Sequence, residues 1–551
     1  MRVYKLIILL FFVISSSLGA QEFFSRAYGG GGSDYAYSVQ ETSDGGYIFC
    51  GPGTLGAGLW DFWVVKLDEK GNINWEKTYG GSSNDIPNSI IETMDKGFLI
   101  SGRTQSFGAG GFDAWVIKID SNGNRLWQKT FGGSGDFDAA YSAVQSSDGN
   151  YYYVAGWSNS FGSGSYDYWI IKLDSSGDIV WQKTTGGTQY ECAYSICLAG
   201  DGGVVVAGGG YVGAGGYDVW VVKLDSSGNN LWQKAFGGTS DDMALSVQKT
   251  NDDGFILTGF TKSFGAGNQD FWVLKLDLSG SLEWQKTYGG TSVDWAFSVK
   301  QTFDGGYIVA GRTDSFGVGN DALIIKLDAI GNLEWQRTYG GSGFEYVYSV
   351  LPAKDGSFIC VGLTNSFGAG DYDAMIVKLE SNCILGNSCP YLSGSSIAVS
   401  NPNPTITSTS KSLLSTSCAT STVISSISNS SSTTTIQCLY PVLPDSVSVS
   451  LKISKSGENP VLDWNNVGGF CSVSGYSIYR GTLPISNYDH TSIDCNNMNL
   501  TYTDLFSTGD HYYLVVPQNN YLEGSYGTDS SGREIPSGIS SCKPKCLLPC
   551  K

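Results

Sequence analysis

Apolar residues in this chain gather in short runs that are separated by turns of Asp, Asn and Gly. In residues 294–341 the four runs are "WAFSVKQT", "GYIVAGRT", "ALIIKLD" and "LEWQRTY". The tight turn "FDGG" lies between the first two runs and "DAIGN" between the last two. Glycine supplies the positive φ that such hairpin turns need. No long stretch has an apolar period of 3.6, so the pattern predicts four antiparallel strands in each unit and no long helix.

A phrase of the form "WQKTYGG" ends each unit, at a nearly constant spacing. Its copies start 51, 52, 54, 51, 52 and 51 residues apart, at Phe24, Trp75, Trp127, Trp181, Trp232, Trp284 and Trp335. A fixed period near 50 is typical of a propeller or another repeat array. A unit of four antiparallel strands is a propeller blade.

The order of the strands predicts how the ring closes. A single outer strand, residues 22–28, precedes seven sets of three strands that are separated by six Trp-bearing strands. The last set ends at Glu380 without a Trp-bearing strand after it. We therefore expect residues 22–28 to complete the last blade, which leaves no open strand edge at the closure. The prediction is an all-β, seven-bladed propeller over residues 21–381.

Residues that recur at one place in every unit are predicted to form the core. The Trp of the outer strand is large enough to fill the wide gap between diverging blades. The Gly-Gly that follows allows a sharp turn back toward the axis. Small residues stand on the innermost strand, and a second Trp stands on the third strand of five units: Ala36, Ala140, Ala193, Ala244 and Ala296, and Trp63, Trp115, Trp169, Trp220 and Trp272, with Leu323 and Met375 in the other two.

These units resemble a family of bacterial and archaeal secreted β-propeller repeats. The patterns "DxWVIKLDxxGNxxWQKTYGG" and "DGGYIVxG" of that family are matched from Phe24 to Glu380 over seven successive units. The resemblance implies an exported seven-bladed propeller, commonly joined to immunoglobulin-like modules, with no defined enzymatic activity. Kelch repeats share the period and a glycine doublet, and they would give the same fold.

The two ends of the chain differ from the repeats. Residues 1–20 have Arg2 and Lys5, then an apolar run, then small residues, which predicts a secretory signal peptide and a secreted or cell-surface location. Residues 382–440 are rich in Ser and Thr and are expected to be a Cys-containing, partly strand-forming linker. Residues 441–541 resemble a fibronectin type III module, with Trp464 as its core Trp, and residues 542–551 form a Cys-rich tail. Nine of the 13 Cys lie from Cys383 onward. In an exported chain this clustering favours disulfides in the C-terminal third, but the sequence does not give their connectivity.

Charge and composition exclude several classes of partner and chemistry. The net charge of −18, with dispersed Lys and Arg, argues against a nucleic acid or an anionic membrane surface as partner. Both His residues, His490 and His511, lie outside the propeller, so no nucleophile–His–Asp set can be assembled there. "KLDSSGNNLWQK" is similar to the blade motif of quinoprotein dehydrogenases, which is structural in those proteins. We expect no catalytic residues, no cofactor and no bound metal, with an extracellular quinoprotein-like enzyme as the alternative.

Two acidic residues recur in every blade on what is predicted to be the same face. They offer a rim for Ca²⁺ as one interpretation. The other is that they cap loop amides or pair with the repeated Lys of the third strand, which sits between apolar residues and needs a partner. The acidic residues are Asp34, Asp85, Asp138, Glu191, Asp242, Asp294 and Glu345, and Asp61, Asp113, Asp167, Asp218, Asp270, Asp321 and Asp373. The lysines are Lys66, Lys118, Lys172, Lys223, Lys275, Lys326 and Lys378.

A ligand without sevenfold symmetry is expected where the repeat is broken. Directly after the first acidic residue, blades one, six and seven carry an aromatic residue, and ring closure makes these blades neighbours. Aromatic faces beside carboxylates suit sugar rings, although the same residues could simply pack between blades. The predicted ligand site is Tyr35, Trp295 and Tyr346 with Asp34, Asp294 and Glu345. The predicted function is non-catalytic binding or adhesion to an extracellular glycan or protein, with an extracellular enzyme or a structural surface-layer protein as alternatives.

Overall fold

The computed structural model describes residues 24–380, apart from Ala57 and Ala214, and beyond them the backbone of thirteen strands between Leu392 and Gln518. The predicted signal peptide, the Cys-rich tail and the side chains of the nine C-terminal cysteines lie outside the described residues. Within the described part, no helix is long and apolar enough to cross a bilayer.

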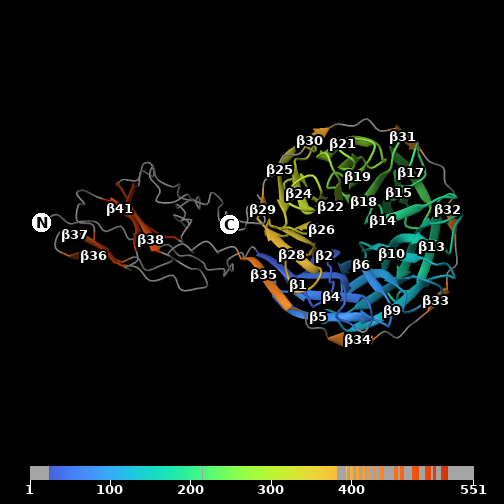
Figure 1. Ribbon diagram of the computed structural model, residues 1–551, viewed down its shortest axis with the longest axis horizontal. Helices are drawn as coiled ribbons and strands as arrows, with labels where there is room; N and C mark the ends of the chain where they lie inside the picture. Colours follow the sequence, from blue (N-terminus) through green and yellow to red (C-terminus); the bar gives the residue numbers. More distant parts are fainter. Residues whose placement is uncertain are drawn as a thin grey trace. The chain divides into compact units, whose positions relative to one another are not determined.

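Seven antiparallel sheets form the propeller, and Figure 1 shows them arranged in a ring. We number the blades by their innermost strands, which lie nearest the centre of the ring in Figure 1: β2 (Ser38–Glu41), β6 (Asp85–Glu92), β10 (Asp138–Gln145), β14 (Glu191–Leu198), β18 (Asp242–Lys249), β22 (Asp294–Gln301) and β26 (Glu345–Pro352). The second strands are β3 (Tyr47–Gly53), β7 (Phe98–Thr104), β11 (Tyr151–Ser158), β15 (Val204–Gly210), β19 (Phe255–Thr261), β23 (Tyr307–Thr313) and β27 (Phe358–Thr364).

The third and fourth strands complete each blade toward the rim. The third strands are β4 (Asp61–Leu67), β8 (Asp113–Ile119), β12 (Asp167–Asp174), β16 (Asp218–Leu224), β20 (Asp270–Leu276), β24 (Asp321–Leu327) and β28 (Asp373–Leu379). The fourth strands are β5 (Ile73–Gly80), β9 (Arg125–Gly132), β13 (Ile179–Thr185), β17 (Asn230–Gly237), β21 (Leu282–Gly289), β25 (Leu333–Tyr339) and, for blade seven, β1 (Phe24–Gly29). The all-β, seven-bladed fold predicted from the repeats is confirmed.

The N-terminal strand closes the ring as the strand order predicts. β1 pairs antiparallel with β28, from Phe24 opposite Lys378 to Tyr28 opposite Ala374. Its side chains also reach blade one, because the Arg26 guanidinium and the Tyr28 hydroxyl both donate to the carbonyl of Gly71 at 2.6 Å. The first strand therefore joins the last blade to the first.

A fifth strand lies on the outer edge of every blade and comes from the segment predicted to be a linker. Around the rim these strands follow the chain in the direction opposite to the blades, from blade six back to blade one and then to blade seven. They are β29 (Leu392–Ser393), β30 (Ala398–Ser400), β31 (Thr405–Ser408), β32 (Leu413–Ser415), β33 (Ala419–Ser421), β34 (Ser426–Asn429) and β35 (Thr433–Leu439), the orange arrows on the rim in Figure 1. We call residues 392–439 the belt. The last belt strand, β35, pairs with β1, so the closing strand has a neighbour on each side.

The core lies between neighbouring blades. The Trp side chains of the third strands are at most 1% exposed, and Leu323 and Met375 are fully buried in the two blades without this Trp. The outer Trp of blades one to five packs against the turn glycine of the next blade, as Trp284 does against Gly331, whose φ is +77°. The predicted role of both Trp positions as packing between blades agrees with these contacts.

A second unit contains residues 440–551. Its described strands form two three-stranded antiparallel sheets. One consists of β36 (Lys452–Ser456), β37 (Asn459–Asp463) and β40 (Thr501–Thr503), and the other of β39 (Thr491–Asn497), β38 (Gly475–Thr482) and β41 (His511–Gln518). The fibronectin type III resemblance rests on side chains that lie outside the described residues, and it stays a prediction.

Candidate functional site

The innermost strand of blades two to seven contains a β-bulge that changes how its side chains are presented. In β22, for example, Ala296 pairs with Gly311 and Ser298 with Ala310, which leaves Phe297 as the extra residue. The same shift occurs in the innermost strands of blades two to seven. The residues at this position are half-buried and mostly aromatic: Tyr37, Asn88, Tyr141, Tyr194, Leu245, Phe297 and Tyr348. Bulges of this kind re-aim side chains and are common beside functional sites.

On one face of the ring, the loop before an innermost strand runs beside the loop between the second and third strands of the preceding blade. Parallel bridges join them, for instance Ser33 to Tyr372 and Asn320 to Phe344. This is the face on which the sequence predicts the ligand. We call it the loop face.

The three aromatic residues of the predicted site are brought together through the bulge residues. The ring centroids of Trp295 and Phe297 are 6.2 Å apart, and those of Phe297 and Tyr348 are 5.0 Å apart. The Tyr348 ring lies 4.8 Å from Tyr37, which stacks on Tyr35 at 6.0 Å. The ring centroid of Tyr346 lies 6.2 Å from that of Tyr348, which adds Tyr346 to this series of rings. We call Tyr35, Tyr37, Trp295, Phe297, Tyr346 and Tyr348 the aromatic arc; all six are half-buried.

Burial changes the acidity of two phenols of the arc. It raises the pKa of Tyr37 to about 12 and the pKa of Tyr348 well above its usual value. Both hydroxyls are therefore protonated at neutral pH and can donate hydrogen bonds.

Two arginines that sequence reasoning did not single out lie among these rings. The Arg312 guanidinium lies over Trp295 at 4.5 Å and over Tyr346 at 5.0 Å, and its Nη1 donates to the Tyr346 hydroxyl at 2.8 Å. On blade two, Arg103 lies between 5.4 and 5.7 Å from the rings of Phe112, Phe137 and Tyr141, and its Nη1 donates to the Tyr141 hydroxyl at 3.1 Å. Trp157 stacks on Tyr141 at 3.8 Å and extends this second cluster.

The signal that could have found both arginines is a second break in the repeat. The second strand of each blade has a repeated Gly followed by a variable residue. This variable residue lies opposite the residue that follows the first acidic residue of the innermost strand, as Arg312 lies opposite Trp295. The variable residues are Pro52, Arg103, Trp157, Gly209, Phe260, Arg312 and Leu363.

The three carboxylates of the predicted site are fully buried and are used by the loops. Asp294 accepts hydrogen bonds from the hydroxyls of Thr313 and Ser315 at 2.5 and 2.8 Å and from the Gly290 amide at 2.8 Å. Asp34 accepts from the amides of Gly30 and Thr54, and Glu345 from the Gly341 amide and the Thr364 hydroxyl; each is 0% exposed. These contacts agree with the interpretation that the carboxylates cap loop amides. The carboxylates offer no free surface to a sugar, so the aromatic arc is what remains of the predicted site.

The second acidic residue of each blade is buried close to the first. A side chain on Gly289 would collide with carboxylate oxygens of both Asp270 and Asp294, so glycine at this position leaves room for the two carboxyl groups. Burial, with the neighbouring carboxylate adding to it, raises the pKa of Asp270 to about 6. The same causes raise the pKa of Asp113 to about 7. Within the described residues no group of three or more His, Cys, Asp or Glu is placed to hold a metal ion.

The repeated Lys of the third strand pairs with the Asp of the first hairpin in six blades. Lys118 contacts Asp95 at 2.9 Å while the Lys118 side chain is 3% exposed. The other pairs are Lys66 with Asp44, Lys223 with Asp201, Lys275 with Asp252, Lys326 with Asp304 and Lys378 with Asp355. A carboxylate partner was expected for all seven lysines, and the sequence suggested the two repeated acidic residues of the loop face. In these six blades the partner is instead the Asp of the first hairpin, on the opposite face.

Blade three departs from that expectation because its first hairpin has one extra residue. Tyr152 takes the register position that Tyr47 has in blade one, so Asp148 is displaced and bonds to Ser146 and Asn150. Lys172 instead lies over the Tyr151 ring at 4.0 Å and donates to the Ser226 carbonyl. Burial lowers the pKa of Lys172.

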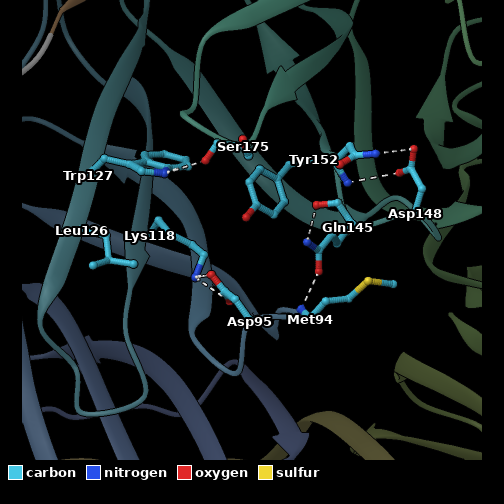
Figure 2. Close-up of a pocket in the computed structure, with 11 residues that line it drawn as sticks. Met94, Asp95, Lys118, Leu126, Trp127, Gln145, Asp148, Tyr152 and Ser175 are labelled. Carbon is cyan, nitrogen blue, oxygen red and sulfur yellow. Dashed lines mark hydrogen bonds and ion pairs between the residues drawn. The ribbon is translucent and has the colours of Figure 1, made fainter.

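The displaced hairpin borders a cavity of about 480 Å³ between blades two and three, on the face opposite the loop face (Figure 2). Its polar lining is largely engaged internally: Lys118 with Asp95, Gln145 with the Met94 amide, and Asp148 with Asn150. Met94 and Leu126 leave apolar surface at its edge, 59% and 58% exposed. With its charged groups already paired, this cavity is a weaker candidate than the aromatic arc.

Comparisons with known proteins give only distant similarities. No family model matches the chain. The "Regulatory protein FlaEY" of Caulobacter vibrioides is 24% identical over 273 residues, which are 44% of this chain and 28% of that protein. This chain thus matches little more than a quarter of that relative's length.

Two solved structures are also similar in part. One is a protein of unknown function from Bacteroides caccae, with 14% identity, a TM-score of 0.31 and coverage of 51% of this chain and 91% of that one. The other is the extracellular domain of a putative hybrid two component system from B. thetaiotaomicron, with 10% identity, a TM-score of 0.17 and coverage of 93% and 98%. These values carry no inference about function.

Proposed function

We propose that the protein is an exported, non-catalytic binding protein whose propeller captures an extracellular glycan on the aromatic arc. The observation that carries the proposal is the arc itself: three non-repeating aromatic residues on blades six, seven and one are joined into one half-buried surface. Half-exposed aromatic faces with nearby hydroxyl donors are suited to the apolar face and the polar edge of a sugar ring.

The surroundings of the arc support a binding surface. Phe344, on the loop that leads into blade seven, is 40% exposed, and its ring centroid lies 6.4 Å from that of Tyr346. Exposed aromatic side chains on a rigid scaffold are typical of interaction sites.

The test is glycan binding by the full chain and by two variants. Trp295→Ala and Tyr346→Ala are expected to weaken binding about tenfold or more, as loss of an aromatic contact in a binding site does. Trp284→Ala is the matched control, since Trp284 is also half-buried but lies on the outer strand of blade five, where it packs on the next blade.

Melting temperature separates binding from folding in this test. Weaker binding at an unchanged melting temperature supports the proposal. Lost stability in the arc variants, with no glycan bound by any form, would make these residues core and would favour the structural surface-layer or enzyme hypotheses.

A further inference from the structure

We propose that the glycan is acidic and that Arg312 and Arg103 bind its acid groups, carboxylate or sulfate. This inference rests on the proposed function, because it names the ligand class of the same site. It starts from an unusual pair of side chains: two half-buried guanidinium groups that are stacked on aromatic rings and form no ion pair with a carboxylate of the described residues.

The hydrogen-bonding capacity of Arg312 is only partly used within the described residues. Its Nη1 is used by the Tyr346 hydroxyl, and its Nε is buried without a hydrogen-bond acceptor. Asp314 is near enough for Arg312 to lower its pKa, but no ion pair joins the two groups, and burial leaves the pKa of Asp314 raised. The stacked guanidinium is thus held in place by Trp295 and Tyr346, and no carboxylate among the described residues forms an ion pair with it.

Arg103 repeats this arrangement on blade two. Its Nη1 donates to the Tyr141 hydroxyl, its Nε is also buried without an acceptor, and three aromatic rings surround it. Across the described residues 24–380 no carboxylate forms an ion pair with it. Lysines of the same propeller show the contrast, because six of the seven buried ones have an Asp within 2.9 Å.

The two arginines belong to one continuous surface. Blades seven and one lie between blades six and two, and the tyrosines of the arc occupy that interval. Tyr346 contacts Arg312, Tyr348 contacts Tyr37, and Arg103 is close enough to Tyr37 to oppose the effect of burial on the pKa of Tyr37. The order along the arc is therefore Arg312, Tyr346, Tyr348, Tyr37 and Arg103, with a cation at each end and phenols between.

A purely structural role does not account for these arginines. A residue needed to build a blade should recur in the other blades, yet their variable residues at this position are Pro52, Trp157, Gly209, Phe260 and Leu363. A partly buried charge without a partner is also unfavourable unless a ligand or solvent compensates it. An arginine stacked on an aromatic face presents a planar set of N–H donors that matches a carboxylate or a sulfate.

The charge of the whole protein limits the ligand further. A net charge of −18 repels a long polyanion such as a nucleic acid. It opposes a short acidic oligosaccharide much less, since exposed charges farther than about 10 Å are largely screened in salt. We therefore infer a short acidic segment of a saccharide, with its sugar rings on the tyrosines.

The experiment compares four probes on the intact chain: an oligouronate, its carboxyl-reduced neutral form, a sulfated oligosaccharide and its desulfated form. The two acidic probes distinguish carboxylate from sulfate as the source of the anion. The expected result is that at least one acidic probe binds about tenfold tighter than its neutral form, the gain of one charged hydrogen-bonded contact. Raising the salt from about 50 to about 500 mM should weaken only the acidic probe.

Two arginine variants and a control assign the effect to the site. Arg312→Gln and Arg103→Gln should remove the preference for the acidic probe, and Arg312→Lys should restore part of it because it keeps the charge and loses the planar donor set. Arg337→Gln, on the outer strand of the same blade as Arg312, should leave the preference unchanged at an equal melting temperature.

The outcomes separate the two proposals. Equal binding of acidic and neutral probes, still abolished by Trp295→Ala, would overturn the acidic ligand and leave the glycan-binding function standing. An acidic preference that survives both arginine substitutions would also overturn this inference. No binding of any of the four saccharide probes would overturn both proposals.

Discussion

At the residue scale, the glycine before the variable position of each second strand is required by a close approach of two strands. The bulge pushes a carbonyl of the innermost strand against it: a side chain on Gly311 would meet the Trp295 carbonyl oxygen well inside van der Waals contact. The same holds at Gly51, Gly102, Gly156, Gly208, Gly259 and Gly362. Gly311 does not have a positive φ, so the requirement is space and not backbone conformation. The feature that re-aims the aromatic side chains is thus the one that requires the glycine.

Gly311→Ala is expected to destabilise the fold by about 1–3 kcal/mol, because the overpacked strands must move apart. It should also weaken glycan binding, since the carbonyl that must shift belongs to Trp295. Gly31→Ala is the control, because nothing lies within 4 Å of a side chain at that position and its φ is not positive. Thermal unfolding of the two variants decides: equal melting temperatures would show that the strands adjust without cost.

Buried acid pairs predict an unusual dependence of stability on pH. The pKa of Asp113 is raised to about 7, and those of Asp218, Asp270 and Asp321 to about 6, by burial first and by the neighbouring carboxylate in addition. A group whose pKa is higher in the folded than in the unfolded chain stabilises the fold fully below about pH 4, and this stabilisation is lost as the pH rises through the folded value.

The melting temperature should therefore fall as the pH rises from about 5 to about 8. Acidification acts in the opposite sense on Asp44 and Asp252, whose pKa is lowered to about 2 by hydrogen bonds and by their lysines, although burial opposes it. Their contribution is lost only as the pH falls from about 4 toward 2. Asp113→Asn should reduce the fall in melting temperature between about pH 5 and about pH 8. Asp371→Asn, at an exposed residue, should leave that fall unchanged. A melting temperature that is constant between pH 5 and 8 would contradict the raised pKa values.

At the scale of elements, β1 completes blade seven and also connects it to the belt and to blade one. It pairs with β28 on one side and β35 on the other, and its Arg26 and Tyr28 bond to the first blade. Every other outer strand is connected to its own blade by a hairpin, whereas β1 is far from β28 in sequence. Its loss removes a strand that no neighbour in the chain can replace.

Deleting residues 22–30 should lower the melting temperature by about 10 °C or more, since each kcal/mol corresponds to a few degrees in a chain of this size. The deletion should also cause aggregation, because β28 and β35 would both present free edges. Light scattering during a thermal melt measures both effects. An intact, monomeric ring with wild-type melting would show that blade seven does not depend on β1.

At the scale of the whole molecule, the belt covers the outer edge of every four-stranded blade, and its strands become the new outer edges of the described propeller sheets. Six of these seven edge strands have only two to four residues, and very short edge strands limit pairing with other chains. Every fourth strand has a belt strand on its far side, and the last belt strand pairs with the first strand of the propeller. Exposed edges invite pairing with other copies of the chain. The belt therefore predicts a protein that stays monomeric at high concentration.

Thr434→Pro with Thr435→Pro tests this in the full chain. Adjacent residues of a strand direct their N–H groups to opposite sides, so one of the two prolines must remove a hydrogen bond to β1, which pairs with both residues. We expect self-association that grows with concentration in size-exclusion chromatography with light scattering. The same pair of substitutions at Ser430 and Ser431, outside the belt strands, should leave the protein monomeric. Two monomeric proteins would show that β35 is dispensable.

The sequence alone determined the parts of this protein that repeat. Blade number, ring closure by the N-terminal strand, the Trp packing between blades and the need of the repeated Lys for a carboxylate partner all depend on residues that recur at a constant spacing. Which Asp supplies that carboxylate was not predicted. Local hairpin geometry is sufficient to place the recurring residues, so the same pattern gives the same contact each time. The clustering of Tyr35, Trp295 and Tyr346 followed from this, because ring closure makes their blades neighbours.

Only the tertiary structure decided what depends on distant or irregular contacts. Arg103 and Arg312 become conspicuous once the second strand is aligned against the innermost one and the neighbouring blade supplies the rings around them. The extra residue in the hairpin of blade three moves Asp148 away from Lys172, a change that the count of acidic residues does not reveal. The belt strands have two to seven residues of mainly Ser and Thr, and backbone hydrogen bonds place them on the rim. Such bonds leave no side-chain period in the sequence, so composition indicates a linker where the fold has a fifth strand for every blade.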